Sequence, residues 1–226
     1  KEPETYEHIR PEIVGNQRRV LVSDQAGKSN LISKLERFGI KVASDDPRLD
    51  RLLSEVKQRE AEGYSYEAAD ASFELLARRI LGSVPDFFEV ESFRVMVERR
   101  HNAIGELVSV SEAVVKIKVG GETVMSVAEG NGPVNALDVA LRKDLGPYQD
   151  AIADLELLDF KVRILNGSTA AVTRVLIESG DSHGARWFTI GVSPNIVDAS
   201  FQALTDSITY RLMKMKAGAD VQVAAE

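Results

Sequence analysis

The spacing of apolar residues changes once along this chain, from the period of a helix to the period of a strand. From residue 30 to residue 82, apolar residues recur every three or four positions, as in amphipathic helices, whereas residues 1–17 look irregular and residues 19–23 are typical of a short strand. Residues that begin or end helices stand at the expected places, at Gly39, Asp45-Asp46-Pro47, Gly63 and Gly82. The pattern predicts helices over residues 30–38, 47–62 and 66–81. We therefore predict a mostly helical module over residues 1–82.

After a boundary at residues 83–86, apolar and polar residues alternate, as in strands. The alternation predicts strands over 88–97, 107–119 and 122–128, with a bulge near Glu112 where its phase slips. A helix from Pro133 to Leu145 follows. A shift of 63 residues lays Val134-Asn135-Ala136 on Val197-Asp198-Ala199, which indicates an internal repeat. The second cycle predicts strands over 155–165, 170–178 and 186–192 and a helix over 196–213.

These elements predict an α+β fold in which a small helical module precedes a βββα–βββα pseudo-repeat over residues 86–214. The strands are antiparallel, the two helices pack side by side on one face, and residues 215–226 form a frayed tail. One apolar edge or face of such a layer stays uncovered. We therefore expect the chain to form a dimer.

The turn Gly130-Asn131-Gly132-Pro133 stands before the first helix of the repeat. The glycines permit a sharp turn, and proline suits the first helical position. The N-terminus of a helix presents unpaired N–H groups and the positive end of the helix dipole, which suits a carboxylate or a phosphate. A tight turn between strand and helix, without any ligand, explains the same residues.

Composition narrows the function. The chain has 28 Lys and Arg against 35 Asp and Glu, a formal charge of −7, which argues against a nucleic-acid partner. It contains no cysteine, no apolar run long enough to span a membrane and no export signal, so we expect a cytoplasmic protein. Because it begins at Lys1 without Met, we expect a fragment. Its three histidines are isolated, so we expect no metal site and a binding module rather than an enzyme.

Several motifs resemble one family of enzymes. They are Thr5-Tyr6-Glu7-His8-Ile9, the stretch from Arg18 to Asn30, Glu129-Gly130-Asn131-Gly132-Pro133-Val134-Asn135-Ala136-Leu137, Asp159-Phe160-Lys161-Val162-Arg163-Ile164-Leu165 and Gly191-Val192-Ser193-Pro194-Asn195-Ile196. Together they resemble the C-terminal part of the α-isopropylmalate, homocitrate and citramalate synthase family, closest to the citramalate branch. The resemblance runs from residue 1 to about residue 214.

The resemblance implies an acyltransferase that condenses acetyl-CoA with a 2-oxo acid, which is pyruvate in the citramalate branch, on a route to isoleucine. In this family an N-terminal TIM barrel, absent here, holds the divalent metal and the catalytic base. This chain alone should therefore hold no cofactor and be inactive. Residues 1–82 correspond to the linker that reaches over the partner's barrel. The resemblance gives Tyr6, His8 and Gln25 at most a positioning role in the partner's active site.

The resemblance also implies that residues 86–214 form a regulatory homodimer domain with an end-product amino acid bound near the subunit interface. Isoleucine is the effector expected for the citramalate branch, and leucine for the isopropylmalate branch. A purely structural dimer domain without effector remains a third interpretation. The effector-binding residues implied by the family are Val134, Asn135, Leu157, Phe160, Ile164, Ala170, Ile190 and Pro194. Asp159 or a backbone carbonyl is the hypothetical acceptor of the ammonium group.

Overall fold

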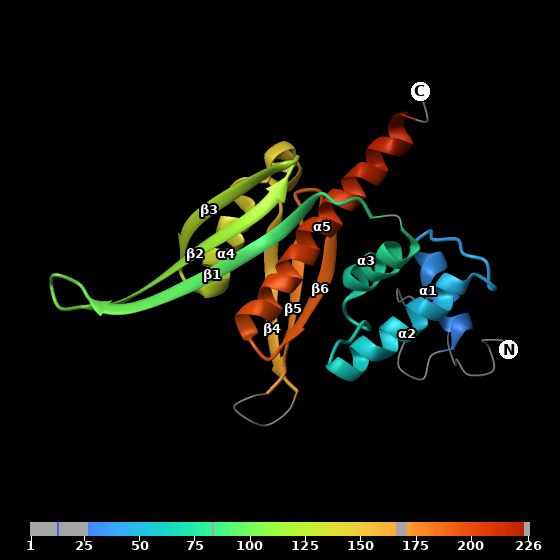
Figure 1. Cartoon of the computed structure of the whole chain (residues 1–226), viewed down its shortest axis with the longest axis horizontal. Coiled ribbons are helices and arrows are strands. Elements are labelled where there is room, and N and C mark those ends of the chain that lie inside the picture. The colour runs from blue at the N-terminus through green and yellow to red at the C-terminus, as the bar shows by residue number, and fades with distance from the viewer. Residues whose placement is uncertain (1–12, 14–26, 83, 166–170, 224–226) are drawn as a thin grey trace.

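The computed structural model describes residues 13, 27–82, 84–165 and 171–223. A group of three helices lies at one end, two β-sheets with a helix each form the middle, and a long hairpin projects at the other end (Figure 1). The helices are α1 (Lys28–Arg37), α2 (Pro47–Glu62), α3 (Asp70–Leu81), α4 (Pro133–Arg142) and α5 (Ile196–Val223), with 3₁₀ turns at Gly146–Tyr148 and Asp150–Ile152. The strands are β1 (Phe88–His101), β2 (Leu107–Val119), β3 (Glu122–Gly130), β4 (Glu156–Ile164), β5 (Thr173–Gly180) and β6 (Arg186–Ser193).

The predicted α+β fold is confirmed. Strands β1, β2 and β3 form one antiparallel three-stranded sheet, here called sheet A, and strands β4, β5 and β6 form a second, sheet B. Helix α4 packs on sheet A and α5 on sheet B, and the two helices contact each other, as the repeat predicts. Because every strand follows its neighbour in the chain, each βββα unit is built from local connections.

Helix α2 of the helical module begins where it was predicted, but helix α3 begins later than predicted. The Asp46 carboxylate accepts a hydrogen bond from the Arg48 backbone N–H at 2.9 Å, and Gly63 ends α2 at φ 116°, where a residue without Cβ is favoured. Helix α3 starts at Asp70, so the predicted start at Tyr66 was wrong. The Tyr66 carbonyl instead accepts from the buried Lys34 ammonium at 2.9 Å, which fixes a turn before the helix.

The predicted bulge lies on a different strand. The register between β1 and β2 shifts between Val90 and Ser92, so the extra residue is Glu91, whereas β2 pairs with β3 without interruption through Glu112. The pattern in β2 changes because its apolar residues change face. Val108 and Val110 lie on the outer face, and the buried series from Ala113 to Val119 lies on the inner face that α4 covers.

Helix α5 is longer than expected and fits closely against sheet B. Its backbone is helical to Val223, so the predicted end at Met213 was wrong, because the polar residues that follow do not break a helix. A Cβ on Gly191 of β6 would lie 1.9 Å from the Ala199 carbonyl oxygen of α5. Only glycine permits this approach of helix and strand. At the other repeat, α4 ends at Arg142, before the predicted Leu145.

The helical module packs on the outer face of sheet B, which is the face that α5 leaves free. Ile190, Leu176 and Val192 of that face join the core of α1, α2 and α3. The Ser72 hydroxyl of α3 accepts from the Ile190 backbone N–H at 3.0 Å and donates to the Asp206 carboxylate of α5 at 3.0 Å. The helical module before residues 83–86 is therefore packed on, and hydrogen-bonded to, the repeat that follows them.

Candidate functional site

The inner face of strand β4 carries a row of apolar side chains that the fold leaves uncovered. Leu157, Phe160, Val162 and Ile164 pair with Ser179, Ile177, Val175 and Thr173 of β5, so all four share the face toward α5. Helix α5 packs on β5 and β6. Leu157, Val162 and Ile164 are therefore 36%, 42% and 65% exposed, while Phe160 is half-buried. Val162 belongs to this row by simple alternation, although sequence analysis did not select it.

The start of α4 packs on the same buried cluster as Phe160 of this row. Val134 and Phe160 pack on the same buried cluster, formed by Val175, Ile177, Ala199, Ala203 and Leu204. Val134 and Phe160 belong to different repeats, and both pack on this one cluster. The five members of this cluster are all 0–1% exposed, so Val134 and Phe160 pack on a fully buried apolar surface.

The N-terminus of α4 differs from that of α5. Asn195 caps α5 through its side-chain oxygen, which accepts from the Val197 N–H at 2.9 Å. Gly132 occupies the equivalent position before α4 and provides no side chain, and Pro133 follows it. The Asn135 side-chain oxygen is turned back to the Asn131 N–H at 3.1 Å. The positive end of α4 therefore meets no side-chain acceptor among the described residues of its cap.

This arrangement suits a small molecule that has both a carboxylate and an apolar group. The start of α4 offers backbone N–H groups to an anion, and the row on β4 offers apolar surface. Both lie around Val134 and Phe160. The face is open on one side in the single chain, because Ile164 remains 65% exposed.

Asp159 lies on the other face of β4. Its register partner is Glu178, on the outer side of sheet B, and its carboxylate pairs with the Lys161 ammonium at 2.5 Å. The hydrogen bond from Lys161 lowers the pKa of the Asp159 carboxyl below its ordinary value. The carboxylate is thus ionised and already has a cationic partner.

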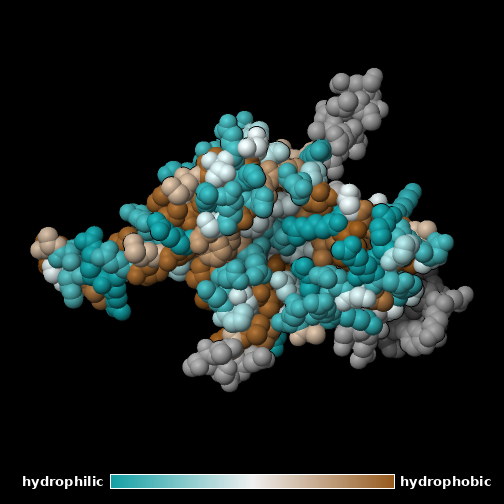
Figure 2. Space-filling view, viewed as in Figure 1, coloured by the Kyte–Doolittle hydropathy of each residue, from teal (hydrophilic) through white to brown (hydrophobic). Residues whose placement is uncertain are grey.

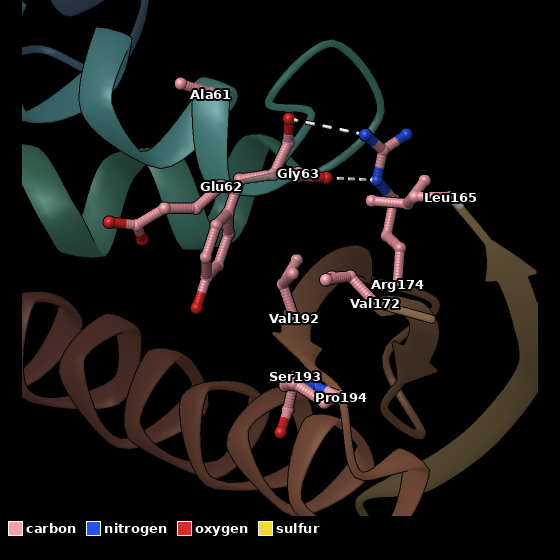
Figure 3. Close-up of a pocket in the computed structure, with 10 residues that line it drawn as sticks. Ala61, Glu62, Gly63, Leu165, Val172, Arg174, Val192, Ser193 and Pro194 are labelled. Atoms are coloured by element: carbon pink, nitrogen blue, oxygen red, sulfur yellow. Dashed lines mark hydrogen bonds between the residues drawn. The ribbon is translucent and has the colours of Figure 1, made fainter. Parts of the chain in front are cut away.

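Ile190 and Pro194 are also separated from Phe160. Ile190 is 2% exposed and is buried against the helical module on the outer face of sheet B. Pro194 lines a cavity of about 650 Å³ between the end of α2, the outer side of sheet B and the start of α5 (Figure 3). Leu165, Val172 and Val192 form its apolar wall.

Arg174 is one of the polar residues that line this cavity, and sequence analysis did not identify it. Its Nε donates to the Gly63 carbonyl at 2.5 Å, and the guanidinium also faces the Tyr64 carbonyl (Figure 3). Burial, and then the charge of its register partner Arg163, lower the pKa of Arg174. Arg174 thus binds the carbonyls at the C-terminal end of α2 and ties the helical module to sheet B.

The remaining predicted residues lie elsewhere. Tyr6, His8, Gln25 and Ala170 fall outside the described residues. Within the described ranges, no three His, Asp or Glu side chains come together as a metal ion would require. In the same part of the chain, none of the helices has the length and apolar character of a membrane span.

Comparison with known proteins identifies relatives along most of this chain. A family model described as the LeuA allosteric (dimerisation) domain matches residues 67–212. An (R)-citramalate synthase of Geobacter sulfurreducens is 53% identical over 216 residues, which are 95% of this chain and 40% of that protein. An (R)-citramalate synthase of Aquifex aeolicus is 47% identical over 95% of the chain and 40% of its own length. One from Synechocystis is 46% identical over 99% of the chain and 41% of its own length.

Proposed function

Since the chain belongs to the family of the LeuA allosteric (dimerisation) domain, we propose that it is a feedback-regulatory domain that binds a branched-chain amino acid. The observation that carries the proposal is that Val134 at the start of α4 and Phe160 in the apolar row of β4 pack on the same buried cluster. The helix N–H groups would bind the effector carboxylate. Leu157, Phe160 and Ile164 would enclose its aliphatic side chain.

The chain spans about two-fifths of the length of the curated relatives it matches. We propose that it is part of a longer cytoplasmic (R)-citramalate synthase, an acyltransferase that joins acetyl-CoA to pyruvate. Catalysis, the divalent metal and acetyl-CoA would belong to a barrel domain preceding this chain. This chain alone would then be inactive, with residues 1–82 as the linker between the two domains.

Isoleucine is the proposed effector because the most similar relatives reported above are citramalate synthases. The apolar row itself discriminates weakly, since one methylene in an apolar pocket changes binding by only about 1–3 kcal/mol. Leucine is therefore the second candidate, as in an isopropylmalate synthase. A domain that only holds two subunits together is a third, and the exposed row on β4 would then be a contact surface alone.

Calorimetric titration with isoleucine, leucine, valine and norvaline tests the proposal. We expect isoleucine to bind most tightly to the wild-type chain. Phe160→Asp should lose this binding, because an unpaired carboxylate would be placed in the apolar row beside the ligand. Met125→Asp is the matched control, because Met125 of β3 is 67% exposed and lies away from the site. Binding of none of the four amino acids would favour the purely structural interpretation.

Feedback also requires the effector to favour one of two arrangements of the domain and its linker. Sheet B offers a physical route, because its inner face carries the proposed site and its outer face carries the helical module. A change in the spacing of β4 and β5 would reach α2 through Arg174 and Gly63. The coupling should therefore depend on this contact.

A further inference from the structure

A second cavity, of about 380 Å³, lies where the helical module meets sheet A, sheet B and α5. Helices α2 and α3 contribute Arg59 and Arg79, strand β1 contributes Phe93, and α5 contributes Thr205. Ile190 belongs to β6, which is the edge strand of sheet B opposite β4. In Figure 1 α3 lies beside α5, and in Figure 2 hydrophobic and hydrophilic residues both reach the surface along this junction. The cavity is therefore separate from the apolar row on β4, and its volume is that of a small-molecule site.

The bulge in β1 places two apolar side chains on this cavity. Val90 and Phe93 pair with Ile117 and Val115 of β2, so both lie on the inner face of sheet A. In an uninterrupted strand, residues three positions apart would lie on opposite faces. Both side chains line the cavity. Bulges of this kind are over-represented beside functional sites, where they redirect a side chain.

Aromatic side chains line the cavity from three parts of the chain. The rings of Phe93 in β1 and Phe201 in α5 have centroids 4.3 Å apart. Tyr64 follows α2, and its hydroxyl donates to the Gln202 side-chain oxygen at 3.0 Å. The Arg59 guanidinium lies 5.5 Å from the centroid of the Tyr64 ring. These walls suit a flat aromatic group, because aromatic rings pack on one another by their faces and edges.

Positive charge predominates in the cavity. The described residues that line it include Arg59 and Arg79 but only one acidic residue, Asp206. Nη2 of Arg79 donates to the Asp206 carboxylate at 2.9 Å, and Nε of Arg59 donates to the Glu55 carboxylate at 2.7 Å. A guanidinium has five N–H donors, so these single bonds leave donors on both arginines for a further acceptor. Two such guanidiniums favour a carboxylate or a phosphate.

The Thr205 hydroxyl in the lining is buried and makes no hydrogen bond with the part of the chain that the structure describes. The Thr209 hydroxyl, one turn later in α5, differs because it donates to the Thr205 carbonyl at 2.8 Å. Buried polar atoms without a hydrogen bond are rare in folded proteins. A molecule bound in the cavity would supply the missing partner.

We propose that this cavity binds a small aromatic anion, that is, a flat ring carrying a carboxylate or a phosphate. Arg59 and Arg79 bind the anionic group, Phe93 and Tyr64 pack against the ring, and Thr205 forms a hydrogen bond with the ligand. Because the ligand contacts the helical module, sheet A and α5 together, its binding stabilises the present arrangement of these parts. The site is additional to the row on β4 and does not depend on it.

Calorimetric titration of this chain with 4-hydroxybenzoate and with AMP tests the proposal and distinguishes a carboxylate from a phosphate. Cyclohexanecarboxylate, which has the charge without the aromatic ring, is the control for the first. Adenosine, which has the ring without the charge, is the control for the second. We expect at least one of the two anions to bind about tenfold more tightly than its control, or better. Binding of neither anion, or equal binding of each anion and its control, would overturn the proposal.

Two variants test whether the anion binds in this cavity. Arg79→Gln and Thr205→Val should each weaken binding about tenfold, because each removes a hydrogen bond to the ligand. Thr205→Val should fold like the wild type, since the hydroxyl that it removes has no partner among the described residues. Arg51→Gln is the matched control, because Arg51 is an exposed residue of α2 outside the lining. Binding as tight in Arg79→Gln and Thr205→Val as in Arg51→Gln would overturn the proposal. Isoleucine is titrated separately, so failure of this site and failure of the proposed effector site are distinguished.

Discussion

Phe160 and Ile190 lie two strands apart in sheet B and face opposite sides of it. Phe160 of β4 packs with Val134 on the cluster beneath α5, while Ile190 of β6 is buried in the core of the helical module. One three-stranded sheet therefore separates the proposed effector site from the helical module. A change that the proposed effector imposed on this sheet would act on the helical module without an intervening element.

The contact through Ser72 should hold the helical module to sheet B. Ser72→Ala would leave the buried Ile190 N–H without its acceptor, and an unsatisfied buried donor costs about 1–3 kcal/mol. Urea denaturation should show a loss of this size. Ser109→Ala, on the exposed part of β2, is the control and should change the free energy of unfolding by less than about 0.5 kcal/mol. Equal free energies of unfolding for the two variants would show that the Ser72 contact does not stabilise the chain.

Gly191 should tolerate no side chain. Gly191→Ala places a Cβ against the Ala199 carbonyl, and overpacking of this kind costs about 1–3 kcal/mol, occasionally more. The midpoint of thermal unfolding should fall by several degrees. Gly132→Ala is the matched control, because it precedes a helix, its backbone is extended at φ −176° and a Cβ there would meet no atom within 4 Å. A Gly191→Ala chain as stable as this control would contradict the close packing of α5 on β6.

Glu74 should contribute strongly to the stability of the contact between α3 and α5. Its carboxylate is 0% exposed and accepts from Arg78 at 2.8 Å, Lys214 at 2.8 Å and the Tyr210 hydroxyl at 3.1 Å. Glu74→Ala would remove these hydrogen bonds and leave Arg78 and Lys214, which are 25% and 43% exposed, without their anion, so we expect a loss of about 1–3 kcal/mol. Glu55→Ala, which removes a more exposed partner of Arg59, should cost much less. Denaturation of both variants side by side checks the difference.

Stability should fall in alkali through the buried tyrosines. Burial raises the pKa of Tyr66 and Tyr210 well above 10, so both phenols stay neutral in the folded chain. In the unfolded chain they ionise near pH 10, so the unfolded state releases protons first and the free energy of unfolding falls as pH rises above 10. Tyr66→Phe should reduce this fall. If the free energy of unfolding fell equally with pH in the wild type and in Tyr66→Phe, the assignment of this fall to Tyr66 would be contradicted.

Much of the fold could be predicted because its patterns are local. The Asp46 cap, the Gly63 end of α2, the alternation in β2 and the repeat at Val134 each rest on a few neighbouring residues. The continuation of β1 to His101 could not be predicted, because Glu98, Arg99 and Arg100 interrupt the alternation. Its pairing with β2 is what keeps this segment extended.

The site was harder to predict than the fold, because it depends on which face of a strand each residue occupies. A bulge between Leu157 and Asp159 resets the alternation of β4 and puts Leu157 and Phe160 on one face and Asp159 on the other. Ile190 and Thr189 are neighbours, yet Ile190 packs in the core of the helical module and Thr189 donates a hydrogen bond to the Ala203 carbonyl of α5. Only the tertiary structure decides these faces. Arg174 was missed because its partners, the Gly63 and Tyr64 carbonyls, lie far away in sequence.

The most direct test of effector binding is the thermal midpoint of this chain with isoleucine, leucine, valine or no addition. A ligand at about 100 times its dissociation constant stabilises the native state by about 2.7 kcal/mol, which corresponds to several degrees. We predict that isoleucine raises the midpoint by this amount and that leucine and valine raise it less. A shift with leucine alone would contradict the assignment of isoleucine, and no shift with any of the three would contradict effector binding by this chain.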